Sequence, residues 1–202
     1  KRTVPPNHPS ISAALNNIGQ VYYNRDNYEE ALKYFQSSLE LDKETLPSDH
    51  PNIAISLDHI GKTYIKQSKL DDAWEKLNEA FKIRKEKLPP NHLAFSCSFD
   101  NLGNYYRSRG QFTEALGKYN ESLELYAKSL NLNDAYKART LFCIGLLYLD
   151  QNEFNESLSY LNQSLEMRKK ALPLSHPHIK KNSNQIGLVY KMMGKYQKAL
   201  EY

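Results

Sequence analysis

The sequence lacks long apolar runs and has few cysteines. No apolar stretch among its 202 residues approaches the roughly 18 to 20 residues that a membrane span needs, and the first residues carry no hydrophobic segment of the signal-peptide type. Cys97 and Cys143 are the only cysteines, which are too few for a disulfide framework and lack the CxxC spacing of a metal or redox site. We therefore expect no membrane partner and a cytoplasmic location.

Concentrated charge and catalytic motifs are also absent. The chain has 27 Lys and Arg residues against 23 Asp and Glu residues, a formal net charge of +4. This charge is spread over the whole chain, whereas a nucleic-acid-binding protein presents a concentrated basic stripe. No GxSxG, GxxxxGK, HExxH or EF-hand pattern occurs. We therefore expect no nucleic-acid partner, and no catalytic, cofactor-binding or metal-binding residue in this segment.

What the sequence has is a repeat of 42 residues, without insertion or deletion. The units are 4–45, 46–87, 88–129, 130–171 and a partial unit at 172–202. Three columns recur in all five units: Gly19, Gly61, Gly103, Gly145 and Gly187; Tyr22, Tyr64, Tyr106, Tyr148 and Tyr190; Ile18, Ile60, Leu102, Ile144 and Ile186. A fixed period of this length is typical of repeat architectures, so we predict one array over residues 1–202.

Each unit predicts two helices. In the first unit, Ile11, Leu15 and Ile18 recur at the three- and four-residue spacing of an amphipathic helix, and Leu32 and Phe35 belong to a second such stripe. Between the two stripes lies a column of residues that favour tight turns: Asp26, Ser68, Gly110, Asn152 and Gly194. The two helices of a unit should therefore pack antiparallel.

Residues that can cap a helix recur before each first helix. The predicted N-caps are Asn7, Asp49, Asn91, Asn133 and Ser175. Histidines follow at one position of the repeat, at His8, His50, His92 and His176. Because a two-helix layer separates neighbouring histidines, capping or first-turn packing is favoured over metal ligation. Cations near the ends of the second helices, such as Arg84 and Arg168, are interpreted as charges that complement the helix dipole.

These columns carry a family resemblance. Leu15, Gly19 and Tyr22, followed by Ala31 and Phe35, resemble the signature of a tetratricopeptide array, and more narrowly the 42-residue type of kinesin light chains. The resemblance covers essentially the whole chain. It implies an all-α fold, a right-handed solenoid of antiparallel helix pairs with nine full helices and a short tenth.

The resemblance also implies a concave groove lined by the first helix of each unit. The predicted groove residues are Asn16, Asn17, Gln20, His59, Lys62, Lys66, Asn101, Asn104, Arg107, Arg139, Phe142, Leu146, Asn184 and Lys191. Amide side chains can bond the backbone of an extended peptide through both donors and acceptors. On the groove columns Lys62, Lys66, Arg107, Arg139, Lys181 and Lys191 outnumber Asp58, Asp100 and Asp150, which favours an acidic partner.

Two apolar features have alternative interpretations. Phe142, Leu146 and Leu149 could form a pocket on the groove face, or could pack under the fifth unit. Trp74 occupies a column otherwise made of leucines, so we predict that it is a core residue.

The pattern favours a non-catalytic scaffold that binds an extended, acidic peptide segment of a protein partner, as kinesin light chain arrays hold cargo motifs. The alternative is the regulatory or targeting region of a larger enzyme, for example an ADP-ribosyltransferase or a signalling ATPase, whose catalytic domain lies outside these residues. In either case we expect a part of a longer chain. No heptad region of the kind that attaches kinesin light chains to the motor occurs in it, so attachment to a motor stays open.

Overall fold

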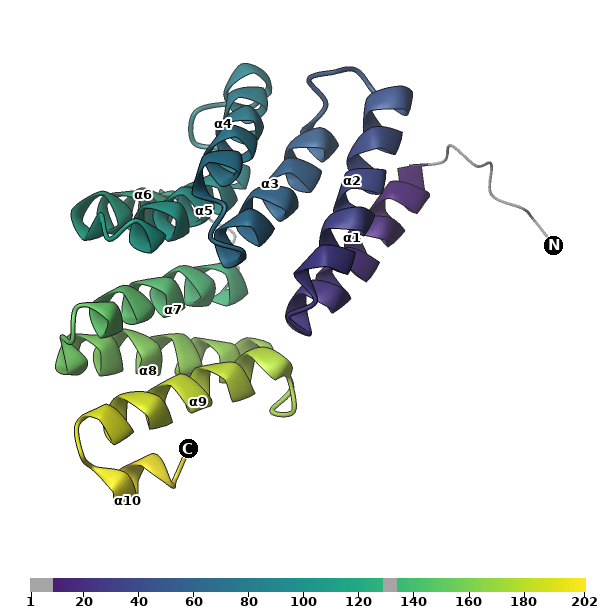
Figure 1. Cartoon of the computed structure of the whole chain (residues 1–202). Helices are drawn as coiled ribbons and strands as arrows, with labels where there is room; N and C mark the ends of the chain where they lie inside the picture. Colours follow the sequence, from purple (N-terminus) through teal and green to yellow (C-terminus); the bar gives the residue numbers. More distant parts are fainter. Residues whose placement is uncertain (1–8, 129–133) are drawn as a thin grey trace. The chain divides into compact units, whose positions relative to one another are not determined.

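The computed structural model describes residues 9–128 and 134–202, and every regular element in those residues is an α-helix (Figure 1). The helices are α1 (Pro9–Asn24), α2 (Tyr28–Thr45), α3 (Pro51–Lys66), α4 (Leu70–Lys87), α5 (Ala94–Ser108), α6 (Phe112–Lys128), α7 (Asp134–Asp150), α8 (Phe154–Ala171), α9 (Pro177–Met192) and α10 (Tyr196–Ala199). The predicted all-α fold is therefore confirmed. None of the described helices combines the length and the apolar character needed to cross a bilayer.

The chain divides into two compact units, residues 1–110 (the N-terminal unit) and residues 111–202 (the C-terminal unit). In the N-terminal unit, α1 and α2 form one helical hairpin and α3 and α4 form the next, with α2 packed on α3 and α4 on α5 (Figure 1). In addition, α1 contacts α3 and α3 contacts α5, so the first helices of successive repeats are neighbours. A single array over both units stays a prediction.

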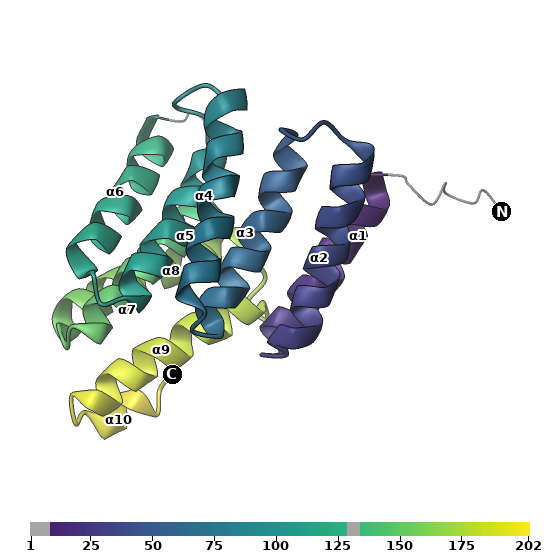
Figure 2. The same cartoon turned by 45° about the horizontal axis from the view of Figure 1, so that its top comes forward.

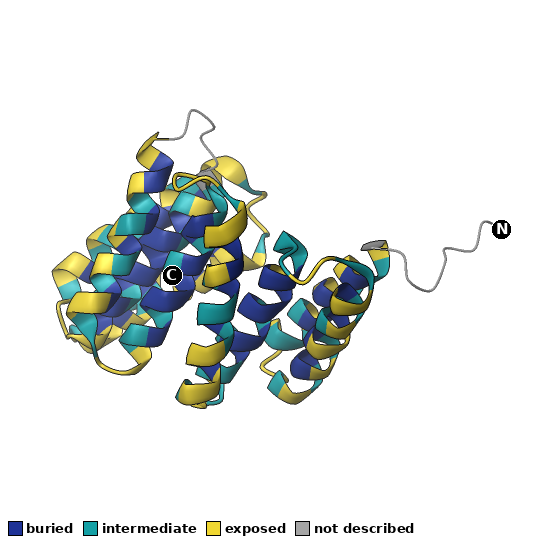
Figure 3. Cartoon of the chain, turned by 90° about the horizontal axis from the view of Figure 1, so that it is seen from above, coloured by how far each residue is buried: buried dark blue, intermediate teal, exposed yellow. Residues whose placement is uncertain are grey.

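The C-terminal unit is built in the same way. Helix α6 packs on α7, α7 and α8 form a hairpin, α8 packs on α9, and α9 contacts the short α10 (Figure 2). Leu161, Leu165, Ile186 and Val189 form the centre of its core. Helices α6 to α9 therefore each have a buried side and an exposed side, as an amphipathic sequence requires, whereas the short α10 has no buried residue (Figure 3).

The tight turns follow the predicted turn column. Its five members all have a positive φ: Asp26 at 57°, Ser68 at 59°, Gly110 at 72°, Asn152 at 62° and Gly194 at 72°. In the first turn, the N–H of Asn27 donates to the Tyr22 carbonyl at 3.0 Å and the N–H of Asp26 donates to the Tyr23 carbonyl at 3.1 Å. These are the two backbone bonds of a Schellman motif, which ends the first helix and reverses the chain.

Three members of the glycine column are explained by close contact between the two helices of a hairpin, whereas at Gly187 an added Cβ would meet no atom closer than 3.3 Å. A Cβ added at Gly19 would lie 2.6 Å from the Phe35 ring, and at Gly61 it would lie 2.7 Å from the Leu77 side chain. At Gly145 the corresponding distance to Leu161 is also 2.7 Å. Real Cβ atoms do not approach other atoms so closely, so only glycine allows this packing.

Histidines, and not the predicted Asp and Ser residues, cap two of the first helices. His50 and His176 are the N-cap residues of α3 and α9, and the Nδ1 atom of each accepts a bond of 3.2 Å from the backbone N–H two residues later. The Nδ1 atom of His92 accepts the Ala94 N–H at 3.1 Å. The capping role predicted for the histidine column is therefore confirmed at these three positions.

The N-caps predicted at Asp49 and Ser175 are wrong by one residue. Both helices begin at the proline that directly follows the histidine, so the histidine is the residue whose side chain reaches the first free N–H groups. Asp49 forms an ion pair with Lys87 instead. Helix α5 begins later, and its N-cap is Leu93 and not Asn91. The predictions for Asn7, His8 and Asn133 fall outside the described residues.

Candidate functional site

The exposed sides of α1, α3 and α5 form the candidate binding surface of the N-terminal unit, which we call the first-helix face. Its predicted groove residues are Asn17 and Lys66, which are exposed, and Gln20, Lys62, Asn104 and Arg107, which are half-buried. These side chains lie on neighbouring helices because α1 contacts α3 and α3 contacts α5.

The structure brings Gln20 and Lys62 together across two repeats. Lys62 Nζ donates to Gln20 Oε1 and lies 4.9 Å from the centroid of the Tyr23 ring. Gln20 Nε2 donates in turn to Asn24 Oδ1 at 2.8 Å. A cation above an aromatic ring is attracted by the ring's negative face. The Lys62 ammonium is therefore held in place on this face. Binding of an anion to it costs less side-chain conformational entropy than binding to a mobile lysine.

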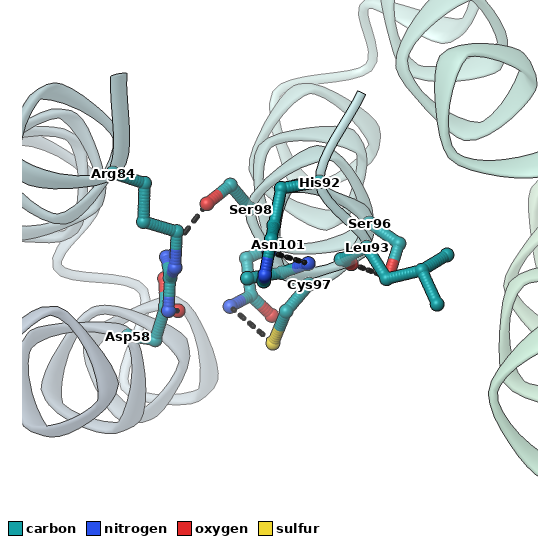
Figure 4. A network of polar contacts seen from close by, with 9 residues as sticks. Asp58, Arg84, His92, Leu93, Ser96, Cys97, Ser98 and Asn101 are labelled. Atoms are coloured by element: carbon teal, nitrogen blue, oxygen red, sulfur yellow. Dashed lines mark hydrogen bonds and ion pairs between the residues drawn. The ribbon is translucent and has the colours of Figure 1, made fainter. Parts of the chain in front are cut away.

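Two of the predicted groove amides are buried. Asn16 is 8% exposed, and its Nδ2 atom donates to Ser56 Oγ at 3.0 Å. Asn101 is 7% exposed, and its Nδ2 atom lies 3.9 Å from Cys97 Sγ (Figure 4). The bond of Asn16 joins α1 to α3, so this side chain contributes to the packing of successive repeats.

A buried ion pair joins α3, α4 and α5. The Nη2 atom of Arg84 donates to Asp58 Oδ2, and its Nη1 atom donates to Ser98 Oγ at 2.6 Å (Figure 4). Arg84 and Asp58 are 4% and 2% exposed. Arg84 lies in the last turn of α4, as predicted, and in addition it neutralises a carboxylate between three helices.

His59, also a predicted groove residue, packs against the core as an uncharged side chain. Its ring meets the Phe35 ring edge to face, with 4.7 Å between the centroids. Burial lowers the pKa of His59 well below its usual value, and the positive charges of Lys62 and Arg84 lower it further. His59 is therefore uncharged at neutral pH and adds no positive charge to the first-helix face.

In the C-terminal unit, three of the predicted apolar residues belong to the core. Phe142 and Leu149 are 6% and 8% exposed and cluster with Ile179 and Ile186 of α9, and the half-buried Leu146 packs against the same cluster. The structure therefore supports packing under the fifth repeat and not a pocket. Of the other predicted residues, Arg139 is half-buried on α7, and Asn184 and Lys191 are exposed on α9.

Arg168 is a second buried arginine, with different surroundings. It is 5% exposed, its Nη1 atom donates to the His178 carbonyl at 2.8 Å, and its guanidinium carbon lies 4.6 Å from the centroid of the Phe142 ring. Burial lowers the pKa of Arg168 to about 10, with a further lowering by Arg139 and an opposite effect of Cys143. Arg168 still carries its charge at neutral pH. Arg168 lies in the last turn of α8, as predicted.

The sequence profile of the tetratricopeptide repeat matches residues 10–86 and 95–170. The chain belongs to the tetratricopeptide repeat family. This confirms the family that the repeat columns predicted. No curated protein matches the sequence.

Solved structures with this fold include kinesin light chain-type proteins. The nearly identical TPR-like repeats of a kinesin light chain candidate from Podosopora anserina align with a TM-score of 0.62 at 22% identity, over 96% of this chain and 92% of that chain. BtubC (BKLC) from P. vanneervenii aligns with a TM-score of 0.67 at 18% identity, over 96% and 77% of the two chains. A Rap protein complexed with Competence and Sporulation Factor aligns with a TM-score of 0.78 at 13% identity, over 93% of this chain and 50% of that chain. At these identities the similarity shows a shared tetratricopeptide fold.

In this tetratricopeptide repeat chain, Trp74 lies elsewhere than its column predicts. Trp74 is 39% exposed, and its ring lies 5.0 Å from the Tyr105 ring and 6.0 Å from the Tyr106 ring between centroids. The prediction that Trp74 is a core residue is therefore wrong. An indole is larger than the leucine of the same column, so it extends past the core and packs on two tyrosines of α5.

Proposed function

We propose that the chain is a non-catalytic, cytoplasmic interaction scaffold that binds an extended, acidic peptide segment of a protein partner along the first-helix face. Membership of the tetratricopeptide repeat family supports the scaffold role. One structure with the same fold is a Rap protein complexed with Competence and Sporulation Factor, which supports a ligand-binding use of the fold.

The positive charge of the first-helix face carries this proposal. Lys62 is held on the face by Gln20 and Tyr23, and Lys66 is exposed one turn further along α3. Two of the aspartates in the same columns, Asp58 and Asp100, are 2% and 1% exposed. Because their carboxylates are not at the surface, the cations of the face outweigh its anions by more than the sequence count indicates.

Amide side chains supply the sequence-independent part of the proposed binding. Asn17 is exposed and Asn104 is half-buried, so they are the best placed to bond a peptide backbone. Gln20 contributes by holding Lys62 on the face, because its amide is engaged with Lys62 and Asn24. Asn16 stays in the proposed site as a residue that joins α1 to α3, and Asn101 as a buried amide of α5. In the C-terminal unit the proposed contacts are Arg139, Asn184 and Lys191.

The test is a peptide-array screen followed by titration of the best acidic peptide into charge-reversed variants. Lys62→Glu and Lys66→Glu should each weaken binding by roughly 0.5 to 1 kcal/mol or more, because each removes a partly solvated ion pair. The loss of binding free energy should be smaller at high salt. The matched controls are Lys82→Glu and Lys85→Glu, because both lysines are exposed on α4 away from the first-helix face. Equal losses in both sets would mean diffuse electrostatic attraction and would refute the proposed location.

A further inference from the structure

Helix α1 exposes apolar residues at positions of the repeat that are buried in the later first helices. Ile18 and Val21 are 41% and 50% exposed. The residues at the same two positions of α3, α5, α7 and α9 are all buried; they are Ile60, Leu102, Ile144 and Ile186, and Thr63, Tyr105, Leu147 and Val189. In α3 and α5 these positions pack on the second helix of the preceding repeat.

Helix α1 matches α9 most closely at these positions. Its residues Ile11, Ile18 and Val21, which we call the N-terminal edge, are identical in type to the equivalent residues of α9, which are Ile179, Ile186 and Val189. In α9 these three residues belong to the core of the C-terminal unit. The half-buried residues that pack against that core from α7 and α8 include Leu146, Phe154 and Leu158. The N-terminal edge therefore has the side chains of one half of this contact.

The other half of the contact recurs, exposed, on α9 and α10. Leu188, Tyr196 and Leu200, which we call the C-terminal edge, are the repeat equivalents of Leu146, Phe154 and Leu158. All three are exposed. They line a hollow of about 440 Å³, which gives room for apolar side chains of another helix. The chain thus presents both halves of a contact that it already makes between α7, α8 and α9.

The charges around the two edges favour their pairing with each other. Helix α1 has no charged residue between Pro9 and Asn24. The C-terminal edge is surrounded by exposed lysines, at Lys191, Lys195 and Lys198. Two C-terminal edges would bring these lysines together and repel, whereas the uncharged α1 can approach them without like-charge repulsion.

We propose that the C-terminal edge of one copy binds the N-terminal edge of a second copy, so that chains associate head to tail. The contact continues the interface that α9 makes with α7 and α8. It is heterologous, because each copy contributes a different surface and keeps its other edge available. This inference does not depend on the proposed peptide binding, since neither edge includes Lys62 or Lys66.

Sedimentation velocity of the 202-residue chain without peptide tests the inference. The average mass should rise with concentration. Val21→Glu and Leu200→Glu should each weaken the association by roughly tenfold or more, because each places an unpaired carboxylate in an apolar contact. The matched controls are Ile55→Glu and Leu174→Glu, since both residues are exposed and apolar and lie outside the two edges. The controls should leave the association unchanged.

An equimolar mixture of Val21→Glu and Leu200→Glu tests the head-to-tail geometry. The first variant keeps an intact C-terminal edge and the second keeps an intact N-terminal edge, so one contact can still form between them. The mixture should give a dimer and no larger species, while each variant alone stays monomeric. Recovery of the dimer also shows that both variants are folded, and circular dichroism of each variant checks this separately.

Several results would overturn the inference. A monomer at every concentration would assign the two edges to other partners. Association that persists in Leu200→Glu but not in Val21→Glu would mean that two N-terminal edges pair, and the reverse pattern would mean that two C-terminal edges pair. Equal losses in the edge variants and in the Ile55→Glu and Leu174→Glu controls would mean nonspecific apolar association.

Discussion

At the residue scale, glycine is required where the two helices of a hairpin touch. Gly19, Gly61 and Gly145 face Phe35, Leu77 and Leu161 at distances that no Cβ would tolerate. The spacing of 16 residues between each glycine and its neighbour is the same in all three hairpins. One repeated residue therefore sets the distance between paired helices.

Gly61→Ala should lower the free energy of unfolding by about 1 to 3 kcal/mol, because the added methyl group overpacks a contact with Leu77. Urea unfolding followed by circular dichroism measures the change. The matched control is Gly117→Ala on α6, where an added Cβ would meet nothing within 4 Å. This substitution should stabilise the chain by about 0.5 to 1 kcal/mol, because alanine favours a helix more than glycine does. Destabilisation of similar size in both variants would contradict the packing explanation.

Two histidines should make stability depend on pH. Burial lowers the pKa of His178 to about 4 and that of His59 well below its usual value, whereas an unfolded histidine titrates near pH 6.5, roughly. Between these values the unfolded chain takes up protons that the folded chain does not. The free energy of unfolding should therefore be largest above pH 6.5 and fall as the pH is lowered toward 4.

Urea unfolding across this pH range checks the effect. The double variant His59→Gln with His178→Gln should show a flatter dependence, because it removes both depressed groups. An unchanged slope in the double variant would mean that other groups cause the loss of stability.

At the scale of the helix, the ends of the elements follow local chemistry closely. The Schellman turns place Asp26, Ser68 and Asn152 at a positive φ, a region that is unfavourable for residues with a Cβ. Glycine takes the same role at Gly110 and Gly194. Asp and Asn adopt this region more readily than other residues with a Cβ, so the cost is largest at Ser68.

Ser68→Gly should raise the free energy of unfolding by about 0.5 to 1 kcal/mol, because it relieves the positive φ of this turn. The matched control is Ser37→Gly, the same substitution at an exposed position inside α2. It should lower the free energy of unfolding by about 0.5 kcal/mol, since glycine disfavours a helix interior. Thermal or urea unfolding measures both variants, and a shift of the same sign in both would contradict the explanation.

At the scale of the whole molecule, the 42-residue period made the fold predictable and left the buried charges unpredictable. Helix pairs, turn positions and glycine contacts depend on residues that recur in every unit, so the sequence alone locates them. The partner of Arg84 lies 26 residues earlier on another helix, and nothing in the local sequence identifies it. The exposed edge of Trp74 similarly depends on its size relative to the leucines of its column. The comparison of Arg84 with Arg168 in the repeat is the one sequence signal that could have marked both as special.

The central claim is that an acidic peptide binds the first-helix face, and NMR mapping of the bound chain tests it most directly. Backbone amide signals of the 202-residue chain would be recorded before and after addition of the best peptide from the array. The account predicts the largest changes at Asn17, Gln20, Lys62 and Lys66 on α1 and α3. Changes centred on the exposed side of α4, around Lys82 and Lys85, would contradict it.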